Sequence, residues 1–199
     1  MKILFTLFVL LFSSSLVADD ISDFEINGVS VGENLLNYYT EYEIIKRINE
    51  VGGDGYGKDK YYGIYFNVEN KKYDRVSYVI NYSKNDSIKK NNEFIIEGLR
   101  GQIFYKDNFL KCLQEKDIAY SHIFKIFNNA EIINDEIRTH FVDTSGESVG
   151  HNITFELKGG YIQILCMNWS EEFTEKNGWN DNLSIQITTK KFGDFLDTL

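Results

Sequence analysis

The segment Gly146-Glu147-Ser148-Val149-Gly150 has the letter pattern of the nucleophile elbow of serine hydrolases, and His151 follows it directly. In such an elbow a strand precedes the serine and a helix follows it, which exposes the hydroxyl on a strained turn. Here the serine is followed by an alternating stretch, 151–158, which predicts a strand instead. We therefore predict that Ser148 is a loop residue, and that Ser148→Ala leaves folding and any activity nearly unchanged.

Two further segments have part of the pattern of a ligand site. Residues 52–59 match the Gly-x-x-x-x-Gly-Lys of a phosphate-binding loop, but Asp59 stands where a magnesium-binding Ser or Thr is required. His140, Asp143 and His151 are near one another, but their spacing sets no two of them on one helix turn or across one tight hairpin. The sequence therefore predicts no nucleotide site, no metal site and no cofactor.

Aromatic residues provide one candidate binding surface. Tyr61 and Tyr65 alternate with apolar residues in a predicted strand, so they point to the other side of its sheet. Together with Trp169 and Trp179 they form a candidate ligand groove or partner surface, because tyrosine and tryptophan favour such places. The alternative is a second layer of packing that a helix or loop covers.

Cys112 and Cys166 are the only cysteines, and we predict a disulfide between them. If Gly159-Gly160 is the two-residue turn of a hairpin, Ile153 lies opposite Cys166, which places Cys166 on the apolar face of the sheet. Cys112 lies on the inward side of a predicted helix, which can be laid over that face. Two buried free thiols are the alternative.

The N-terminus has the pattern of a secretory signal peptide, residues 1–18. Lys2 is followed by an apolar run of ten residues, too short to span a bilayer, and by small residues up to Ala18. We predict cleavage after Ala18, a mature chain of residues 19–199, and a periplasmic or secreted location. The absence of proline and the abundance of Asn, Lys, Ile and Tyr are typical of an AT-rich bacterial genome.

The chain is acidic, with 21 Lys and Arg against 30 Asp and Glu. Loss of Lys2 with the signal peptide makes the net charge of the mature chain one unit more negative than the −9 of the full chain. Such a chain repels nucleic acid and anionic lipid, because phosphate binding depends on clustered Lys and Arg. Nucleic acid is therefore not an expected partner.

The pattern of elements predicts an α+β fold, an antiparallel sheet with helices packed on one face. Helices are expected at 33–39, 41–51, 107–127 and 191–198, and strands at 61–68, 73–82, 93–105, 137–142, 151–158, 161–168 and 183–189. Gly98 and Gly101 predict a bulge or bend in the third strand. The mature chain suits one domain, with two α-then-β halves, 24–105 and 106–199, that could be an old duplication.

The stretch FEINGVSVGENLLNYYTEYEI, residues 24–44, resembles the entry of small secreted bacterial α+β domains. The outer-membrane assembly lipoproteins of the SmpA/OmlA type and the β-lactamase-inhibitor-like domains begin similarly, although this chain lacks the lipid-bearing cysteine of the lipoproteins. The resemblance implies a protein-interaction or ligand-binding domain outside the cytoplasm, and it carries no functional residue over.

Two functions remain open at this point. The first is a non-enzymatic periplasmic binding or protein-interaction module, which the absence of a coherent catalytic set of residues favours. The second is a small periplasmic hydrolase that uses the loop 140–151. The hydrolase requires Ser148, His140 and Asp143 to converge in one concave pocket.

Overall fold

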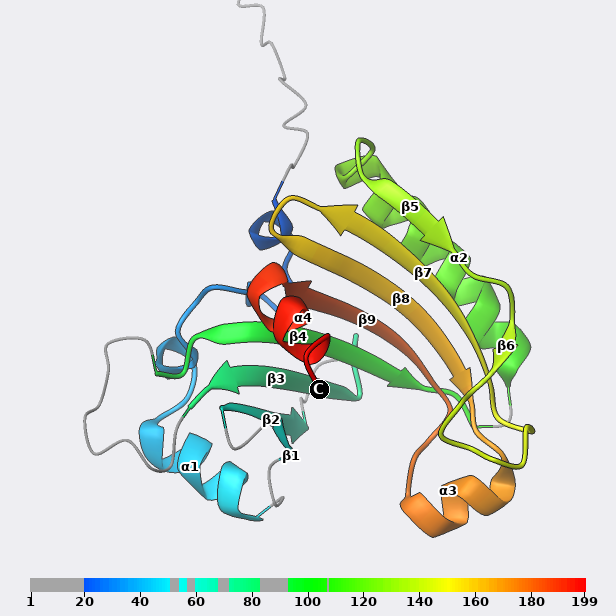
Figure 1. Ribbon diagram of the computed structural model, residues 1–199, viewed down its shortest axis with the longest axis horizontal. Helices are drawn as coiled ribbons and strands as arrows, with labels where there is room; N and C mark the ends of the chain where they lie inside the picture. The colour runs from blue at the N-terminus through cyan, green and yellow to red at the C-terminus, as the bar shows by residue number, and fades with distance from the viewer. Residues whose placement is uncertain (1–19, 51–53, 57–59, 68–71, 83–92, 107) are drawn as a thin grey trace, which may run out of the picture.

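A computed structural model describes residues 20–50, 54–56, 60–67, 72–82, 93–106 and 108–199. The predicted signal peptide and its cleavage site lie outside these residues, as does most of the glycine-rich segment 52–59. Nine strands of the described chain form one antiparallel sheet, and four α-helices pack against it (Figure 1). The fold is α+β, as predicted.

The sheet joins the two halves of the chain at its centre. Its strand order is β1-β2-β3-β4-β9-β8-β7-β5, and β6 also pairs with β7. The strands are β1 (Asp54–Tyr56), β2 (Tyr61–Asn67), β3 (Arg75–Asn81), β4 (Ile96–Phe104), β5 (Glu131–Asn134), β6 (Arg138–Thr139), β7 (Val149–Leu157), β8 (Gly160–Asn168) and β9 (Asn182–Thr189). Because β4 pairs with β9, the segments 24–105 and 106–199 contribute to one continuous sheet.

The predicted bulge in the third strand is confirmed. The pairing of β3 with β4 shifts register between Val79 and Ile80, opposite Gly98. Gly101 has a different role and makes room for Tyr73, because a Cβ atom at position 101 would lie 2.6 Å from the tyrosine ring. This glycine lets the tyrosine lie flat against the sheet.

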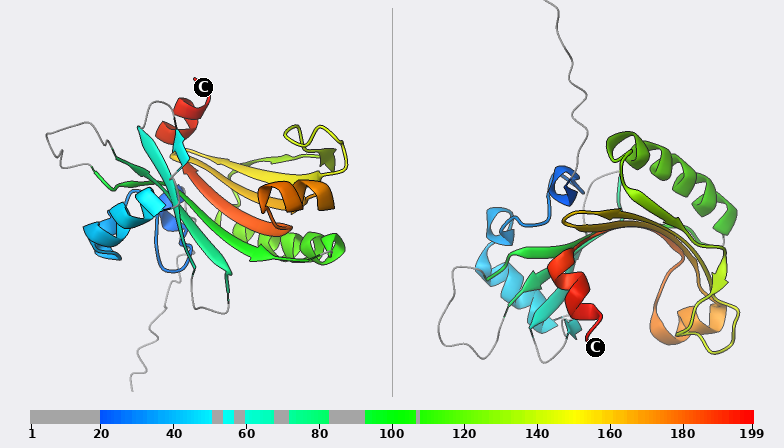
Figure 2. Two further views of the ribbon diagram at one scale, coloured as in Figure 1. Left: turned by 90° about the horizontal axis from the view of Figure 1, so that it is seen from below. Right: turned by 45° about the horizontal axis from the view of Figure 1, so that its top comes forward.

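The helices occupy both sides of the sheet, and not one face alone as predicted (Figure 2). Helices α1 (Glu41–Glu50) and α2 (Phe109–Ile126) bury Ile44, Ile48, Cys112 and Ile123 in the main core. The shorter α3 (Glu171–Asn177) and α4 (Lys190–Leu196) lie inside the arch that the curved sheet forms, whereas α2 lies outside it (Figure 2). No helix in the described part of the chain is long and apolar enough to cross a membrane.

Helix α1 starts with a capping box formed by Thr40 and Glu43. The Thr40 N–H donates to Glu43 Oε2 at 2.8 Å, and the Glu43 N–H donates back to Thr40 Oγ1 at 3.3 Å. The predicted helix 33–39 is wrong, because only a 3-10 turn forms, at Leu35–Asn37. The Glu33 carboxylate accepts hydrogen bonds from the Ser30 N–H and from the Tyr38 hydroxyl. The residue that caps the short turn is Asn34.

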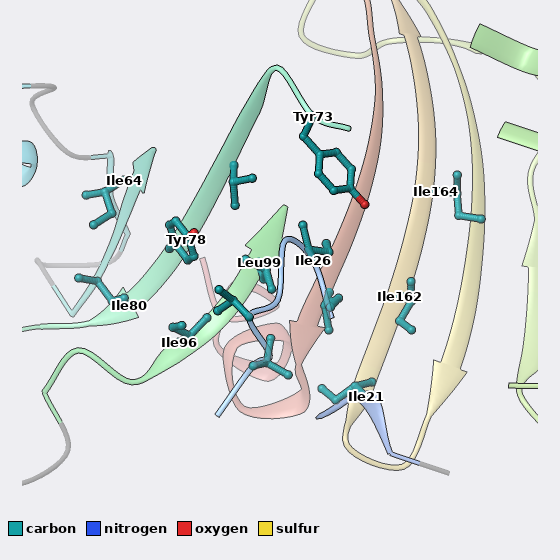
Figure 3. Packing of buried hydrophobic residues seen from close by; sticks show 14 of the residues in the cluster. Ile21, Ile26, Ile64, Tyr73, Tyr78, Ile80, Ile96, Leu99, Ile162 and Ile164 are labelled. Carbon is teal, nitrogen blue, oxygen red and sulfur yellow. The ribbon is translucent and has the colours of Figure 1, made fainter. Parts of the chain in front are cut away.

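The outer face of the sheet carries the core. Isoleucine, leucine and tyrosine side chains of the strands pack there with the N-terminal segment, which contributes Ile21 and Ile26 (Figure 3). These side chains are at most a few per cent exposed. Because side chains alternate along a strand, the residues between them point to the inner face.

The β7–β8 hairpin turns at Lys158-Gly159, so the predicted register is wrong by two residues. Leu157 lies opposite Gly160, and His151, rather than Ile153, lies opposite Cys166. Gly160 is needed within the sheet, because a Cβ atom there would lie 2.0 Å from the Thr188 carbonyl oxygen of β9. A shift by two residues keeps each side chain on its face, so Cys166 remains on the apolar side.

The two cysteines meet between α2 and β8. The Sγ atoms of Cys112 and Cys166 are 2.11 Å apart, at disulfide distance, and both residues are buried. The predicted pairing of the two cysteines therefore agrees with the structure.

Candidate functional site

A groove of about 540 Å³ lies on the inner face of the sheet. Pockets for small ligands commonly have volumes of several hundred Å³. The floor of the groove is polar and comes from three neighbouring strands, β3, β4 and β9. Its side chains are those of Arg75, Ser77, Arg100, Gln102, Ser184 and Gln186.

Strand register places these polar side chains next to one another. Arg100 lies opposite Ser77 of β3 and opposite Gln186 of β9, and Arg75 lies opposite Gln102. The Arg100 Nε–H donates to Gln186 Oε1 at 2.9 Å. Burial lowers the pKa of the Arg100 guanidinium, because the charged form is taken out of water.

Aromatic rings form one wall of the groove. The ring centroid of Trp169 lies 4.8 Å from that of Trp179 and 4.7 Å from that of His140, and all three residues line the groove. Phe173 stacks on Trp169 from α3 at 5.1 Å. The backbone N–H of Trp169 donates to Asp181 Oδ1 at 2.7 Å, which connects the wall to the start of β9.

Helix α3 brings the two tryptophans together. Ser170 caps its first turn by accepting a hydrogen bond from the Phe173 N–H, and Gly178 ends it at φ 69°. The left-handed glycine reverses the chain, so Trp179 returns onto Trp169. The sequence analysis missed this helix, although a Ser cap, two acidic residues in the first turn and a following Gly are its ordinary signals.

Three of the four predicted aromatic residues line this groove: Tyr65, Trp169 and Trp179. Tyr61 is on the same face of the sheet but is 0% exposed. Helix α4 covers it, with the ring of Phe192 at 5.0 Å and that of Phe195 at 4.8 Å. Tyr61 is therefore part of a second packing layer and not of the groove.

The two groove arginines were missed by the sequence analysis. The Arg75 guanidinium carbon lies 4.5 Å from the ring centroid of Tyr65 and 5.1 Å from that of Phe104, so two rings hold it by cation–π contacts. A signal was present, because Arg75 and Arg100 each alternate with the apolar residues of their strands. Alternation alone did not show that this face forms a groove.

The loop 140–148 is built around the Asp143 carboxylate. Its Oδ2 accepts from the hydroxyls of Ser148 and Ser170, at 2.5 and 2.9 Å, and the Ser170 N–H donates to Ser148 Oγ at 2.9 Å. These contacts, with the Ser148 hydrogen bond as the largest cause, hold the pKa of Asp143 well below its usual value. The three side chains join the loop to the first turn of α3.

The Ser148 hydroxyl is closed off from solvent, because Ser148 is 0% exposed and its oxygen both donates and accepts a hydrogen bond. Of Ser148, His140 and Asp143, the groove is lined by His140 alone. The His140 Nδ1 accepts from the Val142 N–H at 3.3 Å and makes no hydrogen bond to Ser148. The expectation that Ser148→Ala leaves folding nearly unchanged therefore does not fit the structure, since that substitution breaks a buried network.

His151 lies apart from this loop. Its Nε2 is 3.1 Å from Asn134 Oδ1 of β5, so it contacts a neighbouring strand. Within the described ranges, no group of three His, Cys, Asp or Glu side chains is placed to hold a metal ion.

Comparison of the chain with protein families, curated proteins and solved structures finds no match.

Proposed function

We propose that the protein is an exported, non-enzymatic binding module that takes a small ligand in the groove on the inner face of its sheet. The observation that carries this proposal is the composition of the groove. Polar side chains form a floor and tryptophans form a wall, and binding sites commonly combine an apolar surface with a few polar groups that orient the ligand.

Export is supported by two independent features of the chain. Residues 1–18 have the charged, apolar and small-residue regions of a signal peptide. Cys112 and Cys166 lie at disulfide distance, and disulfides persist mainly in oxidising compartments outside the cytoplasm. The resemblance of residues 24–44 to secreted bacterial domains adds the expectation of a ligand-binding or protein-interaction role.

Binding is favoured over hydrolysis because of the contacts of Ser148. A serine nucleophile needs a neighbouring base and an open face toward its substrate. The Ser148 hydroxyl instead donates to the Asp143 carboxylate and accepts from the backbone of Ser170, inside the protein. Its contacts hold a loop in place.

Tryptophan fluorescence tests the proposal directly. Trp169 and Trp179 are the only tryptophans of the chain, and both line the groove, so their emission reports its occupancy. Phenylpropanoate, phenylpropanamide and phenylethyl phosphate are suitable probes, because the phenyl ring can pack on the tryptophan wall without absorbing at the red edge of tryptophan excitation. We expect at least one of them to change the emission in a saturable way.

A groove-filling variant provides the control. Ser77 is a half-buried residue of the groove floor, so Ser77→Phe should occupy the space and abolish the response. Ser121→Phe makes the same change at an exposed position of α2, outside the arch, and should leave the response intact. An unchanged response in Ser77→Phe would contradict binding in the groove.

A further inference from the structure

The arginines of the groove stand out against the charge of the chain. The protein has four arginines, Arg47, Arg75, Arg100 and Arg138, against 17 lysines, and 30 carboxylate side chains outnumber both together. Two of the four arginines lie in the groove. None of the ion pairs among the described residues involves Arg75 or Arg100.

Strand register places the two arginines within reach of one small group. Arg100 faces Ser77 across the β3–β4 pairing, and Arg75 is two residues from Ser77 on the same face. Such diagonal neighbours have Cα atoms about 7–8 Å apart, within the reach of long side chains. The two positive charges repel each other, and partial burial takes both out of water.

Each guanidinium is also fixed in place. Arg75 is held between the rings of Tyr65 and Phe104, and its Nε is buried without a hydrogen-bond partner among the described residues. The Arg100 guanidinium is held through its Nε by Gln186, the one side-chain hydrogen bond that the described residues give it. Guanidinium groups fixed in this way present their remaining N–H donors as forks that match carboxylate or phosphate oxygens.

We propose that the ligand carries an anionic head group, a carboxylate or a phosphate, which Arg75 and Arg100 bind together, and a flat apolar body that packs on Trp169 and Trp179. This inference rests on the proposed function and names the chemical class of its ligand. An anion between the two arginines neutralises their repulsion and supplies acceptors for their free donors. The tryptophan wall of the same groove supplies the surface for the apolar body.

The three phenyl probes distinguish the contribution of the head group to binding from that of the apolar body. Phenylpropanoate and phenylpropanamide differ chiefly in charge, and phenylethyl phosphate replaces the carboxylate with the other candidate anion. We expect the dissociation constant of at least one anion to be about tenfold or more below that of the amide, since a charge-assisted hydrogen bond contributes enough for that ratio. Which anion binds more tightly identifies the head group.

Arg100→Gln removes the charge and keeps a polar side chain of similar reach. It should abolish the preference for the anion and leave binding of the amide within about twofold. Arg75→Gln should have the same effect, and it serves as the test if Arg100→Gln proves unstable. Arg138→Gln is the matched control, because Arg138 is exposed on β6 and pairs with Asp135 at 3.7 Å. It should leave the preference unchanged.

Three outcomes would overturn the proposal. Equal affinity for the amide and both anions, or a preference that survives in Arg100→Gln and in Arg75→Gln, would refute the anionic head group while leaving the groove as a binding site. No response to any of the three probes would overturn the binding function and the ligand class together.

Discussion

Removal of the Cys112–Cys166 cross-link should cost the protein a large part of its stability. The two residues are 54 positions apart, one on α2 and the other on β8. On the chain-entropy estimate, a cross-link that closes a loop of that length stabilises the fold by about 4 kcal/mol, because it restricts the unfolded chain. At about 2–4 °C per kcal/mol for a chain of this size, the melting temperature should fall by about 8–16 °C.

Urea unfolding followed by circular dichroism measures this loss. The double variant Cys112→Ala, Cys166→Ala should show it, together with the packing lost at two buried sulfur atoms. Wild-type protein kept reduced is the control that retains both sulfurs, so its loss of stability isolates the cross-link. Mass analysis after alkylation without reductant should find no free thiol in the protein from an oxidising compartment.

A reduced wild type that unfolds within about 1 kcal/mol of the oxidised protein would contradict this stabilisation, because the chain-entropy estimate is well above that value. Two alkylated cysteines without prior reduction would show that the thiols are free. That result would favour the alternative in which both act as small apolar core residues.

Three further changes test the loop and the hairpin. Ser148→Ala should lower the free energy of unfolding by about 1–3 kcal/mol in urea titrations, because it leaves the buried Ser170 N–H without its acceptor; no loss would contradict the network. Asp143→Asn should be less stable than wild type at neutral pH. Because folding lowers the pKa of Asp143, its carboxylate stabilises the folded protein fully above the unfolded pKa of 3.8, and this stabilisation disappears as the pH falls through the folded pKa. The difference in stability between wild type and Asp143→Asn should therefore shrink in acid. A difference that does not depend on pH would refute this. Gly160→Ala should disrupt the pairing of β8 with β9, as seen by a lower melting temperature, because its Cβ would meet backbone atoms; Gly178→Ala, where no atom lies within 4 Å of the added Cβ, should cost only the strain of positive φ.

The alternation of apolar residues was enough to predict most of the sheet. Apolar residues at every second position fixed which side of each strand faces the core, and the β2–β3, β7 and β9 predictions agree with the structure within about two residues. The same parity put Cys166 on the apolar, core-facing side of the sheet even though the register of its hairpin was wrong. The register of the hairpin depends on which two residues form its turn, and two adjacent glycines did not settle this from the sequence. In the structure Gly160 lies within β8, where its close contact with β9 leaves no room for a Cβ atom.

The role of Ser148 could not be read from its neighbours in sequence. Its partner Ser170 is 22 residues away, and the connection exists because α3 follows the end of β8, which pairs with the start of β7. Once α3 was missed, the loop 140–148 had no visible reason to be ordered. A hydroxyl in such a loop is then expected to face solvent, whereas the structure buries it.

The groove could not be predicted from the sequence either. Parity assigns Arg75 and Arg100 to the face opposite the core, where charged residues are ordinarily solvated. What makes that face a groove is the curvature of the sheet together with α3 and α4, two short elements from the last thirty or so residues of the chain that fold back under the arch (Figure 2). The arginines of the floor, on β3 and β4, are therefore far in sequence from α3 and α4, and neither part has a pattern that points to the other. The residues that carry the proposed binding chemistry become recognisable in the structure, where the two arginines lie beside a tryptophan wall and form no ion pair with a carboxylate of the described residues, although the chain has 30 Asp and Glu.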